Sequence, residues 1–238
     1  MRLETPNFIK VNGDQLRYSV ERRRVNHARL EFRADGLLVV LPKGMDEAEL
    51  FEEKKRWIAR KHREIRGVLE KLESMRNGKK VFPIFGEIFE FRDGESLKVD
   101  FANKVVECNA QDSRHCRRLE RIMKRELLVE LEPVVKEYSD KFGAKFNRIT
   151  VKKLRSKWAS CSSRGNLNFS LWLACLPHEL IKYVSCHEVA HLIEMNHSRR
   201  FWELVGKEFG NYKELEKRLS ENSFLVRECM NSTKIDFF

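Results

Sequence analysis

The pentapeptide His187-Glu188-Val189-Ala190-His191 constrains the fold of this chain more than any other segment. Apolar residues surround it, which predicts a buried helix that begins at Pro177 and runs to about Met195. Four residues turn a helix by about 400°, so the two imidazoles project from one face, one turn apart. Such a pair is a typical set of nitrogen ligands for one divalent ion, with zinc as the default.

Glu188 lies about 100° around the predicted helix from His187, which places its carboxylate beside a bound ion. A carboxylate there can take a proton from water at the ion and later return it to a leaving group. The alternative is a helix with two hydrogen-bonded core histidines and a surface glutamate. That alternative gives no reason for a third histidine nearby, so we favour a metal site.

The third ligand remains open between two residues. His197 follows His191 by six residues, and Asn196-His197-Ser198 has the composition of a turn. Asn196 tolerates a left-handed backbone, so a reversal there would bring His197 towards the ion. The spacing matches His-Glu-x-x-His-x-x-Gly-x-x-His, except that Glu194 replaces the glycine. Glu194 could instead be a ligand, or could orient an imidazole.

Positive charge is concentrated near a second motif. The chain holds 47 Lys and Arg against 36 Asp and Glu, a net charge of +11, and the segment 141–164 has no acidic residue. This segment either is a solvated basic face or attracts phosphates or acidic peptides. Within it, Arg155 and Lys157 could polarise a carbonyl or hold a phosphate, and Trp158 either packs in the core or contacts substrate.

Strand signals dominate the first part of the chain and helix signals the second. Segments at 84–91 and 97–108 read as strands, and a charged helix from Asp46 to about residue 77 precedes them. A long helix from Ser113 to about Gly143 follows, which Pro133 should kink or divide. We therefore predict the α+β class, with a β-rich N-terminal domain that contains one helix at 1–110 and a second domain at 111–238.

Membrane and export signals are missing from the sequence. The longest apolar run is far shorter than the about 18–20 residues that span a bilayer, and the first six residues lack the apolar core of a secretion signal. We therefore expect a cytoplasmic protein with no membrane partner.

An ordered set of motifs resembles the YgjP-like family of metal-dependent hydrolases along the whole chain. The set comprises Arg155-x-x-Trp158-Ala159-Ser160-Cys161-Ser162, Leu167-Asn168, Pro177, Tyr183-Val184 before the pentapeptide, and Asn196-His197-Ser198-x-x-Phe201-Trp202. The resemblance implies a zincin-like catalytic domain, related to SprT-like metallopeptidases, with an active-site helix and a small β-hairpin or sheet. It also implies His187, His191 and His197 as metal ligands and Glu188 as the base. Ala159 departs from the family, which usually has glycine there.

Three functions compete on these grounds. The leading one is a zinc metallopeptidase that acts on a peptide or protein through water activated by Glu188. The second is a metal-dependent nucleotide pyrophosphohydrolase that cleaves a phosphoanhydride, for which magnesium or manganese would suit an anionic substrate. The third is a non-catalytic, zinc-stabilised nucleic-acid-binding protein, and Glu188 argues against it because a structural zinc site needs no base.

Overall fold

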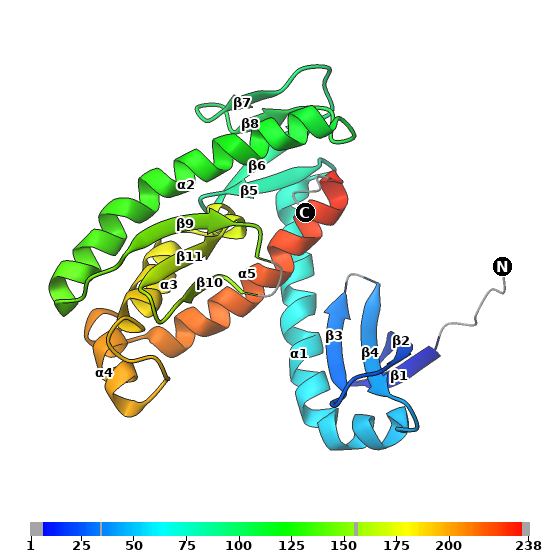
Figure 1. Ribbon diagram of the computed structural model, residues 1–238. Helices are drawn as coiled ribbons and strands as arrows, with labels where there is room; N and C mark the ends of the chain where they lie inside the picture. The colour runs from blue at the N-terminus through cyan, green and yellow to red at the C-terminus, as the bar shows by residue number, and fades with distance from the viewer. Residues whose placement is uncertain (1–6, 34, 155–156, 235–238) are drawn as a thin grey trace. The chain divides into compact units, whose positions relative to one another are not determined.

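The structure, a computed structural model, describes residues 7–33, 35–154 and 157–234, and its elements are shown in Figure 1. Contacts divide the chain into two compact units, Met1–Ser74 and Met75–Phe238. This division differs from the boundary expected at 110/111. The reason is that the strands within 81–107 bury their apolar side chains, among them Phe82 and Val106, in the same core as the later helices.

The first unit contains a four-stranded sheet and most of one long helix. The sheet order is β1-β2-β4-β3, with β2 and β4 parallel and the other pairs antiparallel. Its elements are β1 (Asn7–Val11), β2 (Asp14–Arg23), β3 (Arg29–Arg33), β4 (Gly36–Pro42) and α1 (Glu47–Arg76). Strands β3 and β4 form a hairpin in which Arg33 pairs with Gly36, so Gly36 is the first residue of β4. At the start of α1, Asp46 accepts the backbone N–H of Ala48 at 3.1 Å.

The second unit begins with another small sheet, of order β5-β6-β8-β7. Its strands are β5 (Val81–Ile84), β6 (Glu87–Arg92), β7 (Lys98–Asp100) and β8 (Val105–Glu107). The segment expected as one strand at 84–91 is therefore a hairpin that turns at Phe85-Gly86. Both turn residues are left-handed, with φ of 49° and 80°, which matches the twist of a two-residue hairpin.

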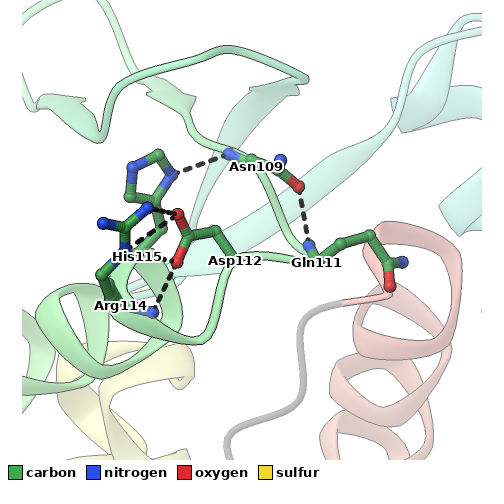
Figure 2. Close-up of polar contacts among 5 residues, drawn as sticks. All are labelled: Asn109, Gln111, Asp112, Arg114 and His115. Carbon is green, nitrogen blue, oxygen red and sulfur yellow. Dashed lines mark hydrogen bonds and ion pairs between the residues drawn. The ribbon is translucent and has the colours of Figure 1, made fainter.

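Helix α2 (Ser113–Phe142) has a capped N-terminus, which Figure 2 shows in detail. Asp112 accepts the backbone N–H of Arg114 at 2.8 Å, and hydrogen bonds and charge from the Arg114 side chain hold the pKa of that carboxyl well below its usual range. The N–H of Asn109 donates to Nδ1 of His115 at 3.1 Å, so His115 has a structural role here. The cap fixes the chain where the sheet ends and α2 begins.

Pro133 does not divide α2, which was one of the two outcomes expected from the sequence. The helix continues to Phe142 and ends on Gly143, which is left-handed with φ 64°. Pro133 lies on the exposed side of the helix, so its missing N–H leaves the Val129 carbonyl near solvent. Leu131 and Val135, on either side of the proline, are fully buried and hold both halves against the core.

The remaining elements carry the candidate site. They are β9 (Arg148–Lys152), β10 (Ala159–Cys161), β11 (Asn166–Ser170), the 3₁₀ helix η1 (Leu171–Cys175), α3 (His178–Ala190), α4 (Arg199–Glu208) and α5 (Tyr212–Thr233). The small β-hairpin or sheet that the family resemblance implies is present: β10 and β11 form an antiparallel pair, and β9 joins β11 in parallel. The predicted α+β class is confirmed. Among the described residues, no helix is both long enough and apolar enough to cross a bilayer.

Candidate metal centre

Helix α3 and its C-cap residue place the two histidines of the pentapeptide, His187 and His191, on one face. Its buried residues include Leu180, Val184 and Val189, which hold the helix in the core of the second unit. His187 and His191, one turn apart, have ring centroids 4.9 Å from one another. The geometry that the four-residue spacing predicts is therefore present.

Helix α3 ends at Ala190, earlier than the expected Met195. The N–H of Leu192 donates to Val189 at 3.0 Å, and the N–H of Ile193 donates to Ala190 at 3.1 Å. These bonds span three residues where the α-helix spans four, so the last turn tightens and the chain leaves the helix axis. The early end lets the following residues fold back towards the histidine face.

His197 returns to this face through a short turn. Asn196 is not left-handed, contrary to expectation; its side chain instead accepts the backbone N–H of Ser198 at 3.0 Å. Ser198 then caps α4, accepting the N–H of Phe201 at 3.4 Å. Two side-chain hydrogen bonds therefore fix the backbone on the C-terminal side of His197.

The three imidazoles converge. His187, His191 and His197 each offer a ligand atom, and these atoms lie within 4.8 Å of one another. The Nε2 atoms of His187 and His197 are 3.0 Å apart. Two nitrogens bound to one tetrahedral zinc at about 2.0–2.1 Å lie about 3.3 Å from one another, so the spacing fits such an ion.

A backbone contact sets the orientation of His191. Its Nδ1 lies 3.0 Å from the backbone carbonyl of Glu194. Since a carbonyl only accepts, Nδ1 carries the proton and the lone pair of Nε2 is free to bind a cation. The Glu194 carboxylate is not part of the histidine cluster in the described chain. Glu194 thus acts on the cluster through its main chain.

Two aromatic rings of α4 enclose the cluster. Phe201 is fully buried, and its centroid lies 4.8 Å from His187, 4.5 Å from His191 and 4.7 Å from His197. Trp202 stacks on His197 at 5.6 Å and on Tyr212 of α5 at 4.7 Å. This apolar shell restricts the imidazole orientations and limits access of water.

The surroundings of His187 and His191 favour the neutral form of both rings. Burial, followed by the neighbouring His191 and His197, lowers the pKa of His187 to about 3. Burial also lowers the pKa of His191. A neutral ring keeps a lone pair, which is the form that binds a metal ion.

Glu188 is the buried carboxylate of the site, with 6% of its surface exposed. Its Oε2 has no hydrogen-bond partner in the part of the chain that the structure describes. Burial raises its pKa to about 7, against the lowering effects of Lys157 and of a hydrogen bond to the Cys161 backbone. An isolated buried carboxylate oxygen is costly, which fits a role next to a cation and its water. The donor set and this oxygen together fit a divalent metal.

A cavity of about 190 Å³ opens beside this carboxylate. Its lining residues are Trp158, Ala159, Tyr183, Val184, His187, Glu188, Glu216 and Leu219. The last two of these, Glu216 and Leu219, lie on α5, and the sequence contains no motif that would have identified them.

The residues expected to bind substrate lie in different places. Trp158 lines the cavity beside Glu188, whereas Lys157 lines a neighbouring one and Arg155 lies outside the described residues. The basic segment is partly neutralised by other elements, because Lys141 pairs with Glu208 at 2.8 Å and with Glu137 at 2.9 Å. Lys153 likewise pairs with Glu120 at 2.9 Å. A segment without acidic residues in sequence therefore has acidic neighbours in space.

One family model matches most of the chain. Residues 26–222 match the sequence model of the YgjP-like metallopeptidase domain. Among curated proteins, no match to the chain is found.

Two solved structures are similar to part of the chain. The metallopeptidase zymogen of Pyrococcus abyssi abylysin is 27% identical, over 37% of this chain and 90% of its own, with a TM-score of 0.35. The metallopeptidase zymogen of Methanocaldococcus jannaschii jannalysin is 23% identical, over 39% of this chain and 88% of its own, with a TM-score of 0.36.

Proposed function

Because the chain belongs to the YgjP-like family, whose metallopeptidase domain matches residues 26–222, we propose that it is a zinc peptidase of the zincin type with Glu188 as general base. The observation that carries this proposal is the convergence of three imidazoles within 4.8 Å, next to Glu188, a buried carboxylate on α3 with an oxygen that has no partner among the described residues. The family match supports a peptide substrate and gives no support to a nucleotide.

His187, His191 and His197 would hold the ion, with the Glu194 carbonyl keeping His191 in the correct tautomer. When bound, a zinc ion supplies Lewis acidity, which polarises the scissile carbonyl and acidifies the attacking water. Phe201 and Trp202 keep the ligand rings in place and exclude bulk water from one side. The cavity beside His187 and Glu188 is the space in which a substrate amide would be bound.

Glu188 transfers a proton from the attacking water to the leaving amine. Its free Oε2 accepts a proton from the water that attacks the carbonyl carbon, and the carboxylic acid that results donates this proton to the amine that leaves. One residue thus serves as base and then as acid. The C–N bond breaks and the water oxygen joins the carbonyl carbon, so the products are a carboxylate and an amine.

Substitution of Glu188 tests its role as the general base. Glu188→Gln keeps the shape of the side chain but cannot take a proton, so peptidase activity on a denatured protein should fall by about 10²–10⁴-fold. Zinc stoichiometry, measured by elemental analysis of the purified variant, should stay that of the wild type, because the three histidines are unchanged.

Glu214→Gln is the matched control, since it removes an exposed carboxylate on α5 and should leave activity unchanged. Full activity of Glu188→Gln would refute the proposed mechanism. If the zinc-, magnesium- and manganese-loaded proteins cleave nucleoside triphosphates and no peptide, the proposal of a peptide substrate is wrong.

A further inference from the structure

A second cavity adjoins the one beside Glu188. It has a volume of about 280 Å³, and its lining residues are Leu154, Lys157, Trp158, Ser170, Trp172, Ser223 and Arg227. Trp158 lines both cavities, so a substrate bound at Glu188 lies one side chain away from the second cavity. Sites for drug-sized ligands span about 300–1,000 Å³, and this cavity lies just below that range. It therefore suits a single side chain or a chain end.

The base of this cavity is held by hydrogen bonds. Ser170 is 1% exposed, and its hydroxyl donates to the Leu154 carbonyl at 3.3 Å and accepts the N–H of Trp172 at 3.3 Å. The N–H of Ser170 also donates to the Trp158 carbonyl at 2.7 Å. One buried serine thus connects three of the segments that line the cavity, and α5 supplies the rest of the wall through Ser223 and Arg227.

Two cations line this cavity. Among the described residues, neither Lys157 nor Arg227 has a carboxylate within 4.0 Å, whereas Lys141 and Lys153 are paired. The Arg227 guanidinium lies over the ring of Phe224, 5.9 Å from its centroid, which orients the side chain. The charge of Lys157 also acts on Glu188, which places it within electrostatic reach of the reacting groups.

We propose that this cavity is a substrate subsite that binds a carboxylate of the peptide, through Arg227 and Lys157, beside the bond cleaved at Glu188. The inference rests on the proposed peptidase function and adds a substrate preference to it. A guanidinium presents paired donors that match a carboxylate, and the two indole rings cover the apolar part of the bound group. The carboxylate can belong to an acidic side chain or to the C-terminus of the peptide.

The test uses peptides that differ in one group. Three peptides with amidated C-termini carry Glu, Gln or Lys at one position next to the cleaved bond, and a fourth carries Gln with a free C-terminus. For the zinc-loaded protein, kcat/KM should be highest for the Glu peptide if an acidic side chain is bound. It should be highest for the fourth peptide if the C-terminus is bound.

Substitution of Arg227 should reduce this preference. In Arg227→Gln, the ratio of kcat/KM between the preferred peptide and the amidated Gln peptide should fall about two- to fivefold, which is the upper part of the range for a partly exposed charge pair. Arg227→Glu should shift the preference towards the Lys peptide. Arg117→Gln removes the same charge from the exposed face of α2, lines neither cavity and should leave the ratio unchanged.

The outcomes separate the two proposals. Equal kcat/KM for all four peptides, or an unchanged ratio in Arg227→Gln, would overturn the subsite and leave the peptidase standing. Failure to cleave any peptide with zinc bound would overturn both.

Discussion

His197 owes its place in the metal centre to contacts that its neighbours make. Asn196 and Ser198 form the turn, and Phe201 packs against the ring from the following helix. The result is a third imidazole whose Nε2 lies 3.0 Å from that of His187, although ten residues of sequence separate them. The alternative ligand, Glu194, contacts the site through its backbone carbonyl.

We predict that His197→Ala weakens zinc binding by more than about 10–100-fold, which is the cost of losing a hydrogen-bond partner of a ligand, because the ion keeps only two protein ligands. Glu194→Gln should leave the affinity unchanged, because the backbone carbonyl remains. Competition with a chromophoric chelator measures both values. A tight site in His197→Ala together with a weak one in Glu194→Gln would assign the third ligand to Glu194.

At the scale of elements, the β5–β6 hairpin supports the start of α3. The N–H of Phe85 donates to the Ala174 carbonyl at 2.8 Å, and its ring stacks on His178 at 5.4 Å. Gly86 approaches Pro177 so closely that a Cβ would lie 2.7 Å from the Pro177 Cα. A turn far from the metal centre in sequence therefore fixes the N-terminus of the helix that carries His187 and His191.

Gly86→Ala should consequently lower the free energy of unfolding of the second unit by about 2–4 kcal/mol, through a steric clash added to a left-handed backbone. Gly143→Ala is the matched control. Gly143 is left-handed too, but nothing lies within 4 Å of its added Cβ, so only about 1 kcal/mol should be lost. Urea unfolding measures both. Equal losses would show that the approach to Pro177 does not matter.

At the scale of the whole molecule, the chain consists of two units with separate cores. Buried residues of the first unit come from its sheet and α1, including Leu38, Val40 and Ile58. The core cluster around the metal centre contains residues from 82 onwards only. All three histidines belong to the second unit, so binding of a metal ion acts directly on that unit alone.

We therefore predict two unfolding transitions, of which zinc shifts one. A ligand at one hundred times its Kd stabilises the binding unit by about 2.7 kcal/mol. Trp57 is the one tryptophan of residues 1–74, so comparing the fluorescence of wild type and Trp57→Phe in guanidinium assigns each transition. His197→Ala should lose the zinc shift. A single transition that zinc moves as a whole would contradict the division.

Local patterns in the sequence determined most elements. Asp46 identified a helix start, because a capping signal acts over a few residues. Pro133 does not divide α2, because burial of Leu131 and Val135 on both sides of the proline keeps the helix continuous. The boundary at 74/75 likewise depends on which core receives the strands of residues 81–107.

At the site, the helical period alone placed His187 and His191 on one face with Glu188 beside them, since four residues make about one turn. Only the tertiary structure decided the tautomer of His191 and which of His197 and Glu194 joins the histidine cluster. It also decided that Trp158 and Arg227 line the same cavity. The physical reason is the distance along the chain over which each constraint acts. Spacing within a helix follows from backbone geometry, whereas the meeting of segments about seventy residues apart follows from the packing of a shared core.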